Sequence, residues 1–365
     1  MKNLFLILIV TSAVFLLQGC QKERAAIQSG QELSVQHSDL KDFTVGFDMD
    51  KFQALIEANN DRLASNGIYA GRNECVESAT VPQDYGTIQE AVDMVCENGS
   101  ITVTAGTYNE YIMIYKKGLT LKTKGEVLLN GAFILDENAD STKIKEFIIN
   151  IIVPDGELPA GIFALGADGL DISKNEIYGG NNGIFLWNIN GSKVKDNFVH
   201  DVGLGIQISS QSGYTSHNNK VIKNTVTRVT YATGIGLQGN CDFNTIQNNS
   251  VTHCSTSTNA AIYIRSYPTA YCNNNVVRNN ICSFNTYGGI RASGECIDNT
   301  IGPNNICNNN QRYGILIGSG TADNQILGNE ALNNNPCDIF DFSGGMNVFT
   351  NNIHECFSTS IMIPQ

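Results

Sequence analysis

A repeat that runs from Leu158 to the C-terminus constrains this chain more than any other feature of its sequence. Each copy of the repeat has an apolar run that usually follows glycine. About ten residues later comes the pattern Val/Ile-x-x-Asn-x-apolar. The asparagines of the eight copies lie 22 to 31 residues apart: Asn175, Asn197, Asn224, Asn249, Asn280, Asn304, Asn329 and Asn351. A period of this length is typical of a solenoid, in which each turn buries its apolar face against its neighbours.

Each repeat carries three short apolar columns. The first has alternating apolar positions, which predict a strand rather than a helix, and its inward residues are Ile162, Ile184, Ile206, Ile235, Ile262, Ile290, Ile315 and Ile339. The second and third columns begin at Ile172 and Ile177. Three apolar faces in a turn of about 25 residues predict an all-β chain folded as a single-stranded right-handed parallel β-helix. A leucine-rich repeat would need its own leucine frame and a helix in every unit, and the sequence has neither.

The asparagine column is expected to be structural. Asparagine tolerates left-handed backbone, and its amide bonds to neighbouring backbone groups. Asparagines stacked at the strand spacing of about 4.8 Å can also bond each other along the solenoid axis.

The N-terminus predicts export from the cytoplasm. Residues 1–19 have a charged start and an apolar core, as a secretory signal peptide does. Leu17-Gln18-Gly19-Cys20 resembles the lipobox of bacterial lipoproteins, which implies cleavage before Cys20 and lipid, including palmitate, on that residue. The resemblance implies a lipid-anchored protein of the bacterial cell envelope, at the outer membrane or the periplasmic face. The alternative is an ordinary secretory peptide in which Cys20 forms a disulfide.

The rest of the chain divides into three segments. Residues 20–48 are polar and predict a lipid-proximal tether, residues 49–79 predict a short helical or linker segment, and residues 80–365 predict the β-helix. Within the last segment, the stripe of Ile88, Ala91 and Val92 predicts a short helix, with Thr87 and Glu90 as a capping box. This helix would cover the open sheet edge of the first turn.

Cysteine content and charge limit the function classes. Ten cysteines remain after Cys20, and in an oxidising compartment an even number predicts disulfides. Cys75 and Cys96 bracket the N-terminal segment, while Cys241, Cys272 and Cys296 share one column, where neighbours could bridge although three cannot all pair. The net charge is −12 and no basic patch is present, which excludes a nucleic-acid partner. We expect a monomer with no required cofactor.

The stretch from Val81 to Leu121 carries a family resemblance. It contains Val81-Pro82-Gln83-Asp84-Tyr85-Gly86-Thr87-Ile88-Gln89-Glu90-Ala91-Val92 and continues through Ala105-Gly106-Thr107-Tyr108 to Lys117-Gly118-Leu119-Thr120-Leu121. It resembles the opening of pectin-lyase-like β-helix proteins, such as pectin methylesterases and the periplasmic family linked to nitrous oxide reductase maturation. The resemblance covers roughly residues 80–365. It implies the β-helix fold without selecting an activity, because many activities share that fold.

The outward positions of the first strands predict a groove. One outward column holds Phe163, Phe185, Gln207, Gly236, Tyr263 and Arg291, and the next holds Leu165, Trp187, Ser209, Gln238, Arg265 and Ser293. Longer loops follow Ile206 and Ile262 and would form two walls of the groove. Gly236 lies between them and has no side chain, so the bottom of the groove would be deeper there. Rings with a few polar groups suit sugars, so the expected glycan-binding residues are Trp187, Gln207, Gln238, Tyr214 and Tyr267. Alternatively, loops fold over the aromatic residues as a satellite core.

The residue types on this face argue against a hydrolase or a methylesterase and are compatible with a lyase. Hydrolases of this superfamily need clustered aspartates, and its methylesterases need an aspartate pair; the central turns offer neither. Tyr263, Arg265 and Arg291 are the candidate catalytic residues of a lyase, with the arginines neutralising a carboxylate and Tyr263 accepting a proton. Calcium has weak candidate ligands, which are Asp242, Glu295 and Asp298.

Three functional hypotheses follow. The first is a cell-envelope lipoprotein whose groove binds a glycan without changing it. The second is a polysaccharide lyase or related carbohydrate-active enzyme that uses Tyr263 and the two arginines, which is more consistent with the residues than a hydrolase or an esterase. The third is a structural or adhesive solenoid without a small-ligand site.

Overall fold

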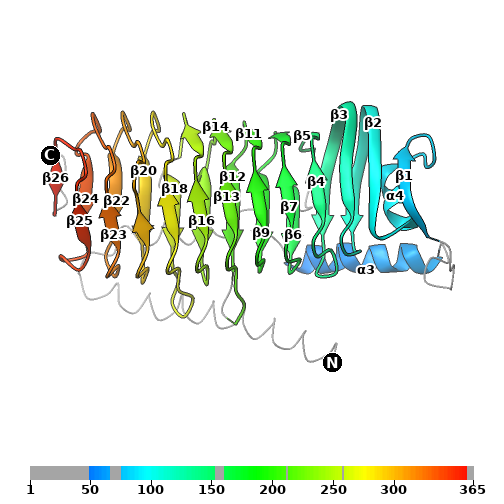
Figure 1. The fold of residues 1–365 in the computed structure, drawn as a ribbon, viewed down its shortest axis with the longest axis horizontal. Helices are drawn as coiled ribbons and strands as arrows, with labels where there is room; N and C mark the ends of the chain where they lie inside the picture. The colour runs from blue at the N-terminus through cyan, green and yellow to red at the C-terminus, as the bar shows by residue number, and fades with distance from the viewer. Residues whose placement is uncertain (1–48, 66–74, 153–159, 211–212, 257–258, 360–365) are drawn as a thin grey trace. The chain divides into compact units, whose positions relative to one another are not determined.

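A computed structural model describes residues 49–65, 75–152, 160–210, 213–256 and 259–359. The predicted signal peptide, the tether and Cys20 lie outside the described residues. In the described part, helix α3 (Met49–Ser65) is followed by strand β1 (Val76–Val81) and helix α4 (Ile88–Met94). The remaining elements are strands that repeat along one solenoid (Figure 1).

The solenoid has about 11 turns of parallel strands. Two long strands, β2 (Val95–Ile114) and β3 (Thr120–Leu135), form its early turns. The first strands of the later turns are β6 (Ala160–Leu165), β9 (Asn182–Trp187), β12 (Leu204–Ser209), β15 (Ile235–Gln238), β18 (Ala260–Arg265), β20 (Gly288–Ser293), β22 (Tyr313–Ile317), β24 (Ile339–Asp341) and β26 (Phe357–Ser358).

The second and third strands are shorter. The second strands are β4 (Lys143–Lys145), β7 (Asp171–Ser173), β10 (Lys193–Lys195), β13 (Lys220–Ile222), β16 (Thr245–Gln247), β19 (Val276–Arg278), β21 (Thr300–Ile301), β23 (Gln325–Leu327) and β25 (Val348–Thr350). The third strands are β5 (Ile148–Asn150), β8 (Glu176–Tyr178), β11 (Phe198–His200), β14 (Thr225–Thr227) and β17 (Ser250–Thr252). Beyond β17, single bridges continue the third column through Ile281, Ile306, Glu330 and Ile353.

The register confirms the predicted first column. Ile162 pairs with Ile184, and Ile184 pairs with Ile206, in parallel strands. Each of these side chains is fully buried in one continuous apolar core that runs the length of the solenoid. The fold class predicted from the repeat, an all-β parallel β-helix with a short helix near its N-terminal end, is therefore confirmed.

Helix α4 is fixed to the first turns at both of its ends. Thr87 and Glu90 form the predicted capping box. In addition, the Glu110 carboxylate on β2 accepts hydrogen bonds from the backbone amides of Ile88 and Gln89. At the other end, Lys116 Nζ donates to three backbone carbonyls, those of Val92, Asp93 and Val95. A seven-residue helix would be marginal alone, so these contacts explain how it stays folded on the first turn.

Helix α3 is joined to this end of the solenoid by one buried carboxylate. Arg62 donates to both oxygens of Asp93, which also accepts hydrogen bonds from Tyr115 Oη at 2.9 Å and Gln89 Nε2 at 3.0 Å. Leu63 of α3 is fully buried beside this contact. Among the described residues, no helix has both the length and the apolar character needed to cross a bilayer.

The asparagine ladder is present, with two corrections. From Asn175 to Asn329, each Nδ2 donates to the Oδ1 of the asparagine in the next turn at 2.9–3.0 Å. The predicted members Asn304 and Asn351 are wrong, because Asn305 and Asn352 occupy those positions. Asn304 and Asn351 instead adopt left-handed backbone, with φ of 63° and 54° at the turn before the ladder position.

Two further polar ladders were missed in the sequence. One lies at the corner before the second strands and contains Ser192, Asn219, Asn244, Asn275, Asn299, Asn324 and Asn347. The other contains Asn285, Asn310 and Asn334 and ends at Asp338, whose second oxygen accepts from the backbone amides of the last described turn. The corners of the solenoid are thus held by amide columns that run beside its apolar core.

Disulfides are present, but not in the column of Cys241, Cys272 and Cys296, where a bridge was expected. Cys75 is bridged to Cys96, and Cys337 is bridged to Cys356. Cys241, Cys272 and Cys296 share a corner of the core as expected, but none of them is disulfide-bonded. A second group of thiols, Cys254, Cys282 and Cys307, is also unbridged and buried. These six side chains pack as small apolar groups in the core.

Candidate functional site

The candidate site is the outer face of the first strands. Because side chains alternate along a strand, the residues between the core isoleucines point away from the core. The parallel register places Gln207, Gly236, Tyr263 and Arg291 in one column on successive turns. A second column contains Ser209, Gln238, Arg265 and Ser293. The structure therefore brings the predicted arginines, tyrosine and glutamines together on adjacent turns.

The aromatic end of this face is covered. Phe163, Phe185 and Trp187 are only 1%, 7% and 8% exposed. The rings of Phe163 and Phe185 lie edge to face with centroids 5.7 Å apart, and Phe185 and Trp187 are 5.8 Å apart. The expectation of an exposed aromatic platform is therefore wrong here, in part because neighbouring turns stand close enough for the rings to cover one another. A role for Trp187 in binding sugar stays a prediction.

Tyr263 is the centre of the first polar cluster. Its hydroxyl lies 2.7 Å from Ser293 Oγ, on the next turn. The guanidinium of Arg291 lies over the Tyr263 ring, 4.9 Å from its centroid. Tyr263 is fully buried and Arg291 is 7% exposed. This geometry fixes the ring and the guanidinium relative to each other before any ligand arrives.

A second cluster lies at the edge of the face. Tyr267, in the loop after β18, donates its hydroxyl to Gln238 Oε1 at 2.9 Å. The Arg265 guanidinium lies 4.8 Å from the centroid of the Tyr267 ring. Arg265, Tyr267 and Ser293 are half-buried, so this edge is more accessible than the Tyr263 cluster. The role of Ser293 was not anticipated, although its place in the same outward column as Arg265 could have suggested it.

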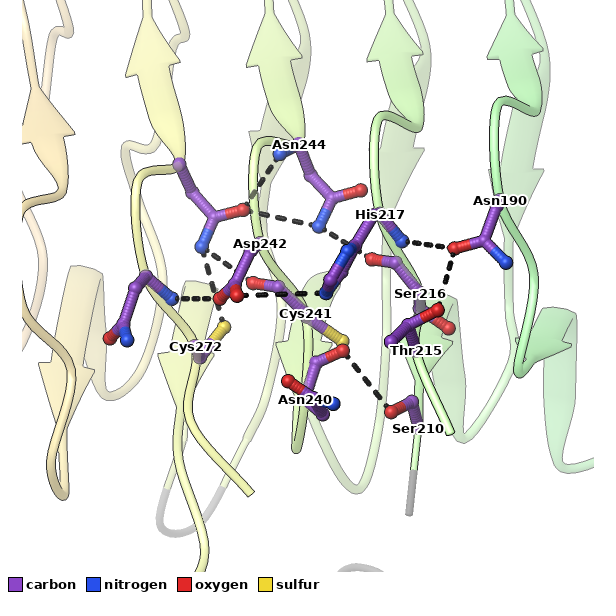
Figure 2. A network of polar contacts seen from close by, with 12 residues as sticks. Asn190, Ser210, Thr215, Ser216, His217, Asn240, Cys241, Asp242, Asn244 and Cys272 are labelled. Atoms are coloured by element: carbon purple, nitrogen blue, oxygen red, sulfur yellow. Dashed lines mark hydrogen bonds and ion pairs between the residues drawn. The ribbon is translucent and has the colours of Figure 1, made fainter. Parts of the chain in front are cut away.

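The described part of the loop after β12 contacts both neighbouring turns through polar groups. Its predicted sugar-binding residue Tyr214 is half-buried, and its backbone carbonyl accepts from Asn240 Nδ2 at 2.7 Å. Further along the loop, the backbone amide of His217 donates to Asn190 Oδ1 at 2.8 Å. Figure 2 shows His217 facing Asp242 across neighbouring turns, with Nε2 and Oδ2 3.5 Å apart. These contacts anchor the wall of the predicted groove.

The three predicted calcium ligands are not gathered by the fold. Asp242 Oδ1 accepts from the backbone amide of Asn273 at 2.7 Å. Glu295 and Asp298 are exposed, and Asp298 lies in a left-handed turn. Within the described ranges, no three His, Cys, Asp or Glu side chains are placed to hold a metal ion together. Calcium binding stays a prediction.

Comparisons with known proteins agree with the fold. The family model described as "Right handed beta helix region" matches residues 151–281. Among solved structures, a Geobacillus virus E2 protein (ORF18) is 15% identical, with a TM-score of 0.53 and coverage of 76% of this chain and 60% of that one. The Agl-KA catalytic domain is 13% identical, with a TM-score of 0.54 and coverage of 78% and 65%. The chain thus spans less than two thirds of both structures.

A third similar structure is the A-module of the mannuronan C-5 epimerase AlgE6 from Azotobacter vinelandii. It is 15% identical, with a TM-score of 0.50 and coverage of 76% of this chain and 94% of the module. No curated protein sequence matches the chain significantly. The described part of the chain is folded as a right-handed parallel β-helix.

Proposed function

We propose that the outer face of the first strands binds a polysaccharide, and that the bound chain is acidic. The observation that carries this proposal is that two guanidinium groups lie over tyrosine rings on adjacent turns. Arg265 lies over Tyr267 of its own turn, and Arg291 lies over Tyr263 of the preceding turn. Neither outward column carries an acidic residue in these central turns, although the whole chain has a net charge of −12. Two fixed guanidinium groups beside aromatic rings suit carboxylate-bearing sugars.

The similar structures support the polysaccharide class. The name of the AlgE6 module states that it acts on mannuronan, which is an acidic polysaccharide. At 15% identity this likeness concerns the fold alone, so the proposal depends on the side chains of this chain. The half-buried edge formed by Arg265, Tyr267 and Ser293 is the part of the face that a bound chain would reach first.

Polysaccharide cleavage is the second candidate function. It is favoured by the Tyr263 hydroxyl, which lies 2.7 Å from Ser293 Oγ while Arg291 covers the same ring. A base must reach the proton that it removes, however, and Tyr263 is fully buried. Binding without cleavage is therefore the better supported function.

One experiment tests both candidates. A panel of acidic and neutral polysaccharides is measured first for binding and then for new absorbance in the ultraviolet band of unsaturated uronates. Binding without new absorbance supports the proposal. New absorbance that is lost in Tyr263→Phe would establish the lyase, and absence of binding to every polysaccharide would leave the structural or adhesive hypothesis.

We further propose that the protein is held at the bacterial cell envelope by lipid on Cys20. The support is the Leu17-Gln18-Gly19-Cys20 sequence. Cys20→Ser is expected to release the protein from fractionated membranes, because the thiol that carries the lipid is gone. Retention of a cleaved, unlipidated Cys20→Ser protein in the membrane fraction would contradict lipid anchoring.

A further inference from the structure

The fold gathers lysines that are dispersed in the sequence. All seven lysines that follow Lys124 lie on the second strands or directly after them: Lys143, Lys145, Lys174, Lys193, Lys195, Lys220 and Lys223. The second strands β4, β7, β10 and β13 pair side by side on successive turns (Figure 1). The expectation of a chain without a basic patch is therefore wrong for this face, because the patch forms only when the turns stack.

Two outward columns carry most of this charge. In one column the parallel register places, on successive turns, Thr120, Lys143, Asp171, Lys193 and Lys220. The other column contains Lys122, Lys145, Ser173, Lys195 and Ile222. We call these ten positions the lysine face. They hold six lysines and one acidic residue, a net charge of +5, although the net charge of the chain is −12.

The lysine face contains opposed like charges. Lys193 and Lys220 lie directly opposite each other on adjacent turns, and both are exposed. Like charges in that position destabilise a sheet. The one acid of the face, Asp171, pairs with Lys145 at 2.7 Å, and among the described residues no ion pair involves Lys193 or Lys220. Packing within the solenoid therefore does not account for this pair.

The acidic residues beside the face are engaged elsewhere. Asp196 and Glu146, in the turns after the second strands, pair with lysines at 2.9 and 3.0 Å. At the corner before these strands, Asp140 and Asp168 each accept from a backbone amide of the next turn, at 2.8 and 2.7 Å. None of these four carboxylates belongs to the two columns, so the columns present their positive charge outward.

We propose that the lysine face docks on a bilayer that contains anionic phospholipid. The choice of this partner rests on the proposed lipid anchor at Cys20. Lysine is a flexible point charge that suits many laterally mobile phosphates, whereas bidentate recognition of one fixed anion favours arginine. The face has six lysines, no arginine and no aromatic ring. Rings are what sugars and unpaired nucleic-acid bases pack against, so a bilayer fits this face better than either.

The dimensions suit a flat anionic surface. Five turns at about 4.8 Å span about 19 Å along the solenoid axis. The 29 residues from Cys20 to residue 48 reach at most about 100 Å when extended, which allows the face to meet the bilayer that holds the lipid. Charges more than about 8 Å away are largely screened at physiological salt, so the local charge of the face outweighs the net charge of the chain. Lipid and a basic patch together hold a protein more firmly than lipid alone.

The test uses the chain from residue 20 onward with Cys20→Ser, which retains every described element and carries no lipid. Co-sedimentation is measured with vesicles of phosphatidylcholine alone and of phosphatidylcholine with phosphatidylglycerol, at low salt and in about 0.5 M salt. We expect binding to the anionic vesicles alone, and only at low salt. Lys193→Gln/Lys220→Gln should weaken this binding tenfold or more without a lower melting temperature, because it removes the opposed charges.

The control is Arg228→Gln/Arg312→Gln, which removes two exposed charges outside the lysine face and should bind the vesicles as its parent does. Equal binding by the lysine variant, or no binding of the parent to anionic vesicles, would overturn the proposal. A lysine variant that melts at a clearly lower temperature would also overturn it, by showing that the lysines are structural.

Two further measurements separate the alternatives. Mannuronan or a DNA duplex that binds the lysine face more tightly than the anionic vesicles do would assign the face to polysaccharide or to nucleic acid and overturn the proposal. Lipid anchoring is tested separately, on membranes washed in concentrated salt. There the lipidated wild type should remain and the Cys20→Ser protein should leave, whatever the vesicles show.

Discussion

At the residue scale, asparagine side chains add columns of hydrogen bonds between turns to the backbone bonds of the parallel strands. Asn224 is representative: its backbone amide and its Nδ2 both donate to Asn249 Oδ1, at 2.9 and 3.0 Å, and Nδ2 also donates to the carbonyl of Val194 at 3.0 Å. All amides of the ladder point the same way, so each bond polarises the next. Loss of one member leaves buried groups of two neighbouring turns without partners.

Asn249→Ala and Asn280→Ala are therefore expected to lower the free energy of unfolding by roughly 1–3 kcal/mol each. The measurement is chemical denaturation followed by circular dichroism. Asn109→Ala is the matched control, because Asn109 Oδ1 also accepts from an asparagine of the next turn, Asn130, but in an exposed position. Equal melting of the two ladder variants and the wild type would contradict the structural role of the ladder.

Residue identity was predictable where the repeat is regular and not where its length changes. The spacing that identified Asn175 to Asn280 fails by one residue at Asn304 and again at Asn351. In the turn of Asn304, one additional residue separates the second-strand residue Ile301 from the ladder position. In the last turn the second-strand position beside Ile326 belongs to Phe349 and not to Val348, so the regular spacing leads to Asn352. Two adjacent asparagines stand at both places. The buried member, Asn305 or Asn352, is distinguished only by its neighbours in space.

At the element scale, helix α4 shows how the solenoid closes its first sheet edge. Its seven residues place Ile88, Ala91 and Val92 on the core. Side chains of the adjacent turn hold both ends, with Glu110 at the first amides and Lys116 at the last carbonyls. The capping box was predictable from local sequence, but Glu110 was not, because it lies 22 residues from the amide that it caps.

Glu110→Ala should loosen α4 at its N-terminus, because two backbone amides lose their acceptor. The expected cost is about 1 kcal/mol, the usual effect of removing a helix cap. Hydrogen exchange should accelerate in residues 88–94 before the rest of the protein changes. Glu126→Ala, at an exposed position of β3, is the control, and unchanged exchange in α4 of the Glu110 variant would show that the cap is dispensable.

The first strands illustrate the limit of prediction for an element. Alternation correctly divided each strand into inward and outward residues, and it placed Tyr263, Arg265 and Arg291 on one face. It could not give the exposure of that face, because exposure depends on everything else that packs there. Phe163 and Tyr263 are outward by alternation and yet 1% and 0% exposed.

At the scale of the whole molecule, disulfides and free thiols occupy different regions. The disulfides Cys75–Cys96 and Cys337–Cys356 cross-link turns near the beginning and the end of the described solenoid. The six thiols between them are fully buried. Burial raises the pKa of the Cys254 thiol to about 11 and raises the pKa of Cys272 and Cys282 as well. A protonated, inaccessible thiol reacts slowly.

We therefore expect these six thiols to stay reduced in the native protein, even though an oxidising compartment is predicted. Iodoacetamide followed by peptide mapping should modify none of them natively and all six after denaturation, with the two disulfides intact. Cys75 and Cys96 serve as internal controls for the oxidised state. A disulfide between Cys241 and Cys272, or rapid native alkylation, would contradict the packing described above.

The central claim is that the arginine-bearing face of the first strands binds an acidic polysaccharide, and calorimetry of an arginine double variant tests it most directly. Wild type and Arg265→Ala/Arg291→Ala are titrated with mannuronan, polygalacturonate and hyaluronan oligosaccharides at low and high salt. Arg278→Ala/Arg312→Ala changes the charge equally and is the control, with Arg278 on β19. We predict salt-sensitive binding that weakens at least tenfold in the first variant alone, about 1.4 kcal/mol. Binding of equal strength in a correctly folded Arg265→Ala/Arg291→Ala protein would contradict the assignment of this face as the binding site.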